Sequence, residues 1–189
     1  HPMPRAFAEI AFTPAVQSIQ KQQGSAASYA KFLKPEVSGG DRLTAAEAVF
    51  ISERDGFYQA SVSETGWPYV QFRGGPAGFL KILSPTQIAY ADYRGNRQYV
   101  STGNLTLENR LSLILMDYPN RRRLKIWGHA TIVSTEEDAA AVARLHDPNY
   151  KAVPERAVII TIDAFDWNCP QHIPQRYTLD ELQDLELLR

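Results

Sequence analysis

The stretch "GFYQASVSETGWPYVQFR" (residues 56–73) decides the fold class, because apolar and polar residues alternate on both sides of a turn. Such alternation is typical of a strand with one buried face. The "ETG" turn (residues 64–66) joins the two runs into a β-hairpin. The sequence therefore predicts that a sheet begins near residue 56.

Further strand patterns follow this hairpin along the chain. They are "FLKIL" (residues 79–83), "QIAYAD" (87–92), "RLSLILMD" (110–117), "LKIWGHATIV" (124–133) and "AVIITID" (157–163). Most of them are joined by short turns, and consecutive strands of this kind favour an antiparallel sheet. We predict a mainly β fold, a β-barrel of six or seven mostly antiparallel strands with peripheral helices.

Helix start signals lie outside the strand region and at one place within it. Thr13 and Pro14 predict a helix N-terminus, and Gly24 predicts its end. Three Ser/Thr-x-x-Glu spacings predict capping boxes: Thr44 with Glu47, Ser134 with Glu137, and Thr178 with Glu181. We predict an N-terminal helical extension over residues 1–42 and a strand domain with a C-terminal helix over residues 43–189.

Charge and composition exclude several classes of protein. The 189 residues carry 20 Lys and Arg against 21 Asp and Glu, a balance that argues against a nucleic-acid or anionic-membrane binder. No apolar run approaches the roughly 20 residues of a membrane span, and the first residues do not have a signal-peptide pattern. Cys169 is the single cysteine, so no internal disulfide can form and we expect a reducing cytoplasm.

Basic residues gather locally although the whole chain is nearly neutral. Between Asp92 and Lys125 there are seven Lys or Arg residues against three acids. The segment "DYRGNRQYVSTGNL" (residues 92–105) follows a strand directly, and loops of this composition bind anions through backbone N–H groups and arginine. A phosphate-bearing ligand fits this pattern. The alternative is that the arginines are solvated and pair with nearby acids.

Other chemistries have weaker support in the sequence. There is no P-loop, and "GGPAG" (residues 74–78) does not match G-x-G-x-x-G. His129, His146 and His172 lack metal-ligand spacing, so no metal site is expected. Cys169 and His172 lie beside Pro170, where a packed turn explains them better than a nucleophile and base. A site without an evident acid, base or nucleophile suits a cofactor that carries the chemistry.

Four segments together resemble the pyridoxamine 5′-phosphate oxidase superfamily, and within it a branch of predicted flavin-nucleotide-binding proteins. They are "GWPYVQFRGGPAGFLKIL" (residues 66–83), "DYRGNRQYVSTGNL" (92–105), "LILMDYPNRRRLKIWGHA" (113–130) and "FDWNCPQHIPQRY" (165–177). The resemblance implies an FMN-binding split barrel that forms a homodimer with FMN at the interface.

The resemblance also assigns residues to the flavin. The first FMN strand of the family falls on four residues that would lie along the ring and ribityl chain: Gln71, Phe72, Arg73 and Gly74. The family's phosphate loop matches residues 95–98, where Asn96 and Arg97 lie and Gln98 replaces a lysine. Arg97 would hold the phosphate as a bidentate fork. Arg73 or Arg94 could supply the charge that Gln98 lacks.

Other positions depart from the family or match it loosely. Asp92 stands where the family has a small hydroxyl residue that contacts FMN, and Arg123 stands where the partner subunit contributes a glutamine. Trp167 and Arg176 match a tryptophan and an arginine that close the flavin site, although core packing is an alternative for Trp167. The oxidase's Arg-Leu-His segment is missing, so vitamin B6 oxidation is not implied, and His172 is the one local candidate to touch a substrate.

Two functions of different class follow from the sequence. One is an FMN-dependent oxidoreductase that NAD(P)H or another donor reduces. The other is a non-catalytic protein that binds or senses flavin or haem. A cofactor-free interaction barrel is a third possibility, which the clustered arginines disfavour.

Overall fold

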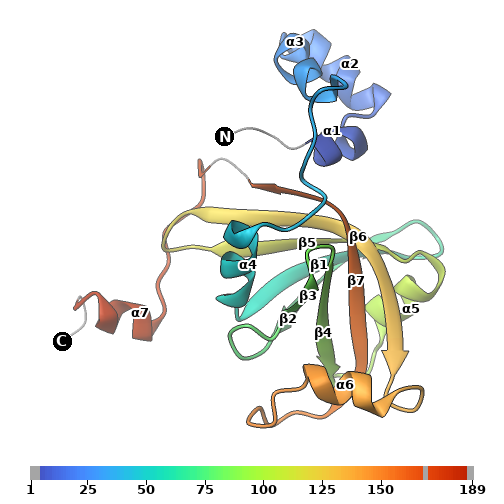
Figure 1. The fold of residues 1–189 in the computed structure, drawn as a ribbon, viewed down its shortest axis with the longest axis vertical. Coiled ribbons are helices and arrows are strands. Elements are labelled where there is room, and N and C mark those ends of the chain that lie inside the picture. Colours follow the sequence, from blue (N-terminus) through green and yellow to red (C-terminus); the bar gives the residue numbers. More distant parts are fainter. Residues whose placement is uncertain (1–4, 168–169, 187–189) are drawn as a thin grey trace.

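One seven-stranded antiparallel sheet forms the centre of the chain, in a computed structural model that describes residues 5–167 and 170–186 (Figure 1). The strands are β1 (Gly56–Val62), β2 (Pro68–Gly74), β3 (Lys81–Ser84), β4 (Gln87–Tyr93), β5 (Arg110–Asp117), β6 (Arg122–Ser134) and β7 (Pro154–Trp167). Their order is β2-β1-β5-β6-β7-β4-β3, with antiparallel neighbours throughout. Since β2 and β3 pair with no further strand in the described part of the chain, the sheet does not close.

Helices surround this sheet. They are α1 (Arg5–Ala11), α2 (Pro14–Gln23), α3 (Ala26–Ala30), a 3₁₀ turn (Lys31–Leu33), α4 (Ala45–Ser52), α5 (Val100–Leu107), α6 (Ala139–Leu145) and α7 (Leu179–Asp184). Figure 1 shows α1 to α3 gathered at one end of the molecule and α6 at the opposite end. The division of the chain at residue 42 stays a prediction.

The hydrophobic core lies on one face of the sheet. Alternation along β5 buries Leu111, Leu113 and Leu115, while the residues between them face the other side. Each such side chain contributes about 1.5–3 kcal/mol when it is fully buried. Helix α4 adds Phe50 and Ile51 to this core. The burial explains why strands of period two, rather than helices, form here.

The predicted mainly β, antiparallel fold is confirmed, with seven strands in a split-barrel arrangement. The capping boxes at Thr44 and Thr178 are present. Helix α2 begins after Thr13, whose side chain accepts from the Val16 N–H, and ends at Gly24 in the left-handed region with φ of 82°.

Two local predictions were wrong. Ser134 and Glu137 do exchange hydrogen bonds, but the helix starts only after Asp138. The reason is that Thr135 still bonds to the Glu155 carbonyl, so strand pairing continues past Ser134. The segment over residues 92–105 is expected from the sequence to be a loop, but its second half belongs to helix α5.

Candidate functional site

A small polar pocket of about 120 Å³ lies where β2, β4, β7 and the loop before α5 meet. Alternation along β2 directs Tyr69, Gln71 and Arg73 toward it, and places Val70 and Phe72 on the opposite face. The other lining residues are Asp92, Tyr93, Gly95, Asn96, Arg97, Gln98, Tyr99, Val100, Ser101, Thr102, Glu155 and Arg156.

A buried carboxylate between two arginines forms the floor of this pocket. Asp92 is 4% exposed, and its Oδ1 accepts a hydrogen bond of 2.8 Å from Arg73 Nη1. Its Oδ2 accepts another of 2.8 Å from Arg156 Nη1. Burial alone would lower the pKa of Arg156, but its bond to Asp92 and the charges of Asp92 and Glu155 raise it. Asp92 therefore fixes both guanidinium groups in place and neutralises one of their two charges.

A second carboxylate ties the loop to β7. Glu155 accepts from the Tyr99 hydroxyl at 2.9 Å and from Arg94 Nε at 3.3 Å. Burial alone would raise the pKa of Glu155, but these hydrogen bonds and the charge of Arg156 lower it. The pocket lining thus holds three arginines, at positions 73, 97 and 156, against two carboxylates, at 92 and 155, and keeps a net positive charge.

The loop before α5 is held in an unusual backbone conformation. Arg97 has φ of 63° and Tyr99 has φ of 56°, a region that costs non-glycine residues about 1 kcal/mol or more each. The Asn96 side chain accepts from the Gln98 N–H at 3.1 Å. Strained residues held by surrounding contacts are typical of ligand sites.

Several donors at the pocket have no protein acceptor. In the described part of the chain, no hydrogen bond or ion pair engages the Arg97 guanidinium. The Nε of Arg73 is buried and makes no hydrogen bond there either. No side chain caps the N-terminus of α5, so its first N–H groups also lack a side-chain acceptor. This donor set suits an anion such as a phosphate group.

The structure brings together half of the residues that the sequence assigned to the flavin. Those that line the polar pocket are Gln71, Arg73, Asp92, Asn96, Arg97 and Gln98. Arg94 lies beside them through its bond to Glu155.

The other assigned residues lie outside this pocket. Phe72 is 56% exposed and contacts Tyr58 on the opposite face of β2. Gly74 ends β2, opposite Gly56. Arg123 pairs with Met116 near the start of β6.

The assigned residues near the end of the sheet have contacts of their own. The Trp167 N–H donates to Glu47 at 2.8 Å, a contact that fits the core-packing alternative. The Arg176 guanidinium lies 5.0 Å from the centre of the Tyr118 ring. His172 is exposed with φ of 65°, and Cys169 lies outside the described residues.

Four further residues that line the pocket were not among those assigned from the sequence: Tyr99, Ser101, Glu155 and Arg156. The Ser101 hydroxyl donates to Gln71 at 2.7 Å and so orients this amide. Arg156 reaches the pocket because it lies directly opposite Asp92 across β4 and β7. Only the register of two strands far apart in sequence places it there.

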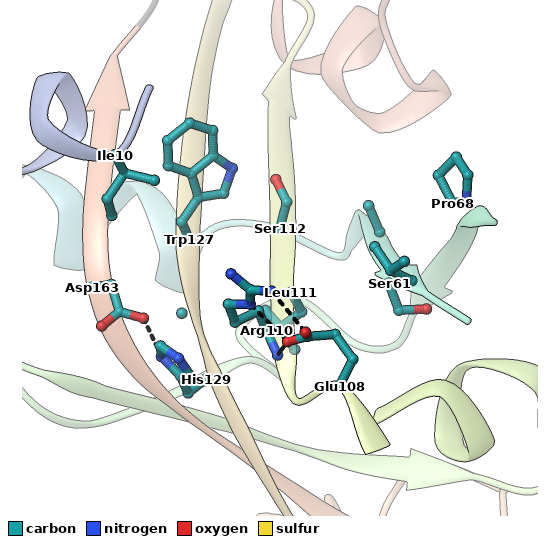
Figure 2. Close-up of a pocket in the computed structure, with 13 residues that line it drawn as sticks. Ile10, Ser61, Pro68, Glu108, Arg110, Leu111, Ser112, Trp127, His129 and Asp163 are labelled. Atoms are coloured by element: carbon teal, nitrogen blue, oxygen red, sulfur yellow. Dashed lines mark hydrogen bonds and ion pairs between the residues drawn. The ribbon is translucent and has the colours of Figure 1, made fainter. Parts of the chain in front are cut away.

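A larger pocket of about 670 Å³ lies on the other face of the sheet and contains none of the assigned residues (Figure 2). Among residues 5–167 and 170–186, no group of three or more His, Cys, Asp or Glu side chains could hold a metal ion. No helix within these ranges has both the length and the apolar character of a membrane span.

Comparison with known proteins gives one family and several similar structures. The family model described as pyridoxamine 5′-phosphate oxidase matches residues 43–167. No curated protein matches the sequence significantly.

Three solved structures illustrate the similarity of fold. HupZ from Group A Streptococcus has a TM-score of 0.54 and 13% identity, over 71% of this chain and 99% of that one. A putative pyridoxamine 5′-phosphate oxidase from Lactobacillus delbrueckii has a TM-score of 0.51 and 17% identity, over 66% of this chain and 93% of that one. An FMN-binding protein from Syntrophomonas wolfei has a TM-score of 0.50 and 9% identity, over 79% of this chain and 97% of that one. At these identities the likeness shows the fold alone.

Proposed function

The chain belongs to the pyridoxamine 5′-phosphate oxidase family, and from this premise we propose that it binds FMN and acts as an FMN-dependent oxidoreductase. The observation that carries the proposal is the polar pocket, where Arg97 and the Nε of Arg73 have no protein acceptor. A phosphate monoester would supply oxygens for the exposed Arg97 guanidinium, since arginine recognises phosphate through paired N–H groups.

The volume of the polar pocket fits the phosphate group of FMN but not the flavin ring. About 120 Å³ can enclose a phosphate group but not a whole flavin nucleotide. The flavin ring must therefore lie beyond the pocket mouth, and other surfaces must cover it.

The residues of this chain have defined tasks in the proposed site. Arg97 binds the phosphate, and Asp92 holds Arg73 and Arg156 so that they do not have to reorganise when the anion enters. Ser101 keeps the Gln71 amide in one orientation. FMN, when bound, supplies the electron-transfer chemistry that no side chain here can supply.

We also propose that two copies associate through the sheet face opposite the core. Tyr58, Val70 and Phe72 are 39%, 62% and 56% exposed and lie on neighbouring strands of that face. Contiguous exposed apolar side chains of this kind mark interaction surfaces. Arg123 belongs to the same face, as the β5–β6 register shows, which fits its proposed contribution to the partner's flavin.

The dimer has a direct test. Phe72→Glu should shift the protein toward the monomer in light scattering, because a charge would be buried between two apolar faces. Leu83→Glu is the matched control, since Leu83 is 50% exposed on β3 at the other edge of the sheet. A monomeric wild-type protein that carries a full complement of flavin would refute the proposed interface.

The cofactor is tested by the absorption spectrum of the purified protein, with mass spectrometry of the molecule that heat releases. Flavin bands with released FMN support the proposal, and so does FMN binding much tighter than riboflavin binding, because riboflavin lacks the phosphate. A haem spectrum, or equal affinity for FMN and riboflavin, overturns it. Reduction of bound FMN by NADPH, with turnover of an added acceptor, separates the oxidoreductase from a non-catalytic flavin protein.

A further inference from the structure

The larger pocket is a groove on the sheet face opposite the core, the same face that we assign to the second copy of the chain. Figure 2 shows Ile10 and Trp127 along one side of this groove, Ser112 in the middle and Pro68 on the other side. The groove is deep because Ala60 and Ser112, which lie directly opposite each other on β1 and β5, have small side chains. A hollow of about 670 Å³ therefore lies within the proposed interface.

Helix α1 forms one wall of the groove and is fixed to the sheet. The ring of Phe7 stacks on Trp127 of β6, with centroids 4.7 Å apart and an angle of 14° between the planes. Ala8 is fully buried, whereas Ile10 is 46% exposed and lines the groove. The wall is thus preformed and presents apolar surface.

The charged side chains at one end of the groove are bonded to one another. Arg110 donates to Glu108 through Nε and Nη2, both at 2.7 Å, and His129 Nδ1 bonds to Asp163 Oδ2. The second pair exists because a β-bulge leaves Asp163 as the extra residue of β7 between two register pairs, and bulges redirect side chains in this way. An apolar side chain can therefore enter the groove without leaving an unpaired charge beside it.

An aromatic ridge stands beside the groove on β1 and β2. Phe72 lies directly opposite Tyr58, with ring centroids 5.2 Å apart and an angle of 63° between the planes. The two residues are 56% and 39% exposed. Two residues further along the same strands, Val70 lies opposite Ala60, where the groove begins. The ridge and the hollow are thus neighbours on one face.

The symmetry of a dimer decides how the ridge and the groove can meet. In a two-fold dimer, a contact of one residue with a second residue of the other copy is repeated in reverse. If ridge faced ridge, both hollows of about 670 Å³ would stay unfilled, although interfaces are packed as densely as protein interiors. If each ridge enters the groove of the other copy, both hollows are filled.

We infer that the ridge of each copy, Phe72 with Tyr58, inserts into the groove of the other copy, between α1 and the β1–β2 hairpin. This inference rests on the proposed association of two copies through this face. It also gives the N-terminal extension a role, because Ile10 of α1 contacts the ridge of the second copy.

The first test moves the bulky side chain from the ridge to the groove. Phe72→Ala removes the ridge and Ala60→Phe fills the groove, so each should raise the dissociation constant of the dimer about tenfold or more. The double variant should dimerise more tightly than either single variant, because a bulky side chain again lies opposite a hollow. Leu83→Ala, on β3 at the other edge of the sheet, should leave the constant unchanged. Sedimentation equilibrium gives the constants, and circular dichroism checks the fold.

A disulfide tests which residues meet. The variant combines Phe72→Cys and Ser112→Cys with Cys169→Ser, which removes the single native cysteine. Within one chain β1 separates β2 from β5, so the two Cα atoms lie at least about 10 Å apart, too far for a disulfide. Oxidation should therefore produce a covalent dimer on a non-reducing gel, whereas Leu83→Cys with Ser112→Cys should not.

A pair of isoleucines tests the role of α1. Ile10→Glu should raise the dissociation constant about tenfold or more, because a charge would be buried against the ridge. Ile19→Glu is the matched control, since Ile19 is 56% exposed on α2 and does not line the groove. Equal effects of the two variants would overturn the role of α1.

The outcomes separate this inference from the proposed function. A monomeric wild-type protein refutes the proposed dimer and this inference with it. If the wild type is a dimer, two results overturn only the contact between ridge and groove: an Ala60→Phe dimer as tight as the wild type, or no covalent dimer from the Phe72→Cys and Ser112→Cys pair. The FMN site, which is measured by flavin binding, stands in either case.

Discussion

Asp92 on β4 lies directly opposite Arg156 on β7, and its second carboxylate oxygen accepts from Arg73 on β2, so one buried acid joins three strands. Strand β2 is the edge of the sheet farthest from β4 in the pairing order. The curl of the sheet brings the two together. This contact creates the pocket that we assign to a phosphate group.

Asp92→Asn should destabilise the fold by about 3 kcal/mol, the scale for one partner lost from a buried ion pair. The guanidinium groups of Arg73 and Arg156, 17% and 15% exposed, would then face a neutral amide. Urea unfolding measures the change. The control is Glu64→Gln in the exposed β1–β2 turn, which should change stability by no more than about 0.5 kcal/mol; equal effects for the two variants would contradict the role of Asp92.

Arg97→Ala should weaken FMN binding by about 2 kcal/mol, because a charged donor to the phosphate is lost. Arg121→Ala is a close control: Arg121 is also an exposed arginine with positive φ, at 52°, but it lies in the β5–β6 turn. Titration of the protein with FMN gives both affinities. If Arg97→Ala binds FMN as well as Arg121→Ala does, the phosphate-loop assignment fails.

Gly128→Ala should lower the free energy of unfolding by about 1–3 kcal/mol, since the new methyl group meets the Thr161 carbonyl oxygen and forces the backbone to shift. Gly103→Ala in α5 should have the opposite effect and stabilise the protein by about 0.5–1 kcal/mol. A Cβ at this position meets nothing within 4 Å, and alanine favours a helix. Thermal unfolding of the pair provides the measurement. A Gly128→Ala protein as stable as the wild type would show that β6 and β7 tolerate a wider separation.

Asp166 should make the protein less stable as the pH rises from about 4 to 6. Burial raises the pKa of Asp166 from 3.8 to about 6, against the attraction of Lys125. The unfolded chain loses this proton near pH 4 while the folded chain keeps it until near pH 6, so the free energy of unfolding falls across that interval.

Asp166→Asn tests this pH dependence. In the variant, the decrease in the free energy of unfolding between pH 4 and 6 that Asp166 causes should be absent. At pH 8 the variant should be more stable than the wild type by about 1 kcal/mol, after allowance for solvent screening. Urea unfolding at pH 4, 6 and 8 gives the comparison. A stability difference between the two proteins that does not change with pH would refute the raised pKa.

Local patterns in the sequence were sufficient to predict the class of the fold, whereas the phosphate loop stays a prediction from the resemblance. Period-two alternation, as in "RLSLILMD", reports burial of one face directly, and caps such as Thr13 and Thr44 act within one turn of helix. Such signals are local, so no tertiary information was needed. The resemblance added Arg97 and its neighbours, which lie together because they are adjacent in the chain.

Contacts between residues far apart in the sequence, by contrast, depend on the tertiary structure. Arg156 reaches Asp92 through strand register, Phe72 and Arg73 separate because one residue along a strand changes the face, and His129 meets Asp163 through a bulge opposite a glycine. Helix α5 was also not predicted from the sequence, since Gly103 and its hydroxyl-rich neighbours have low helix propensity. The common reason is physical: register, curl and bulges are set by the packing of the whole sheet, and no short stretch of sequence contains that information.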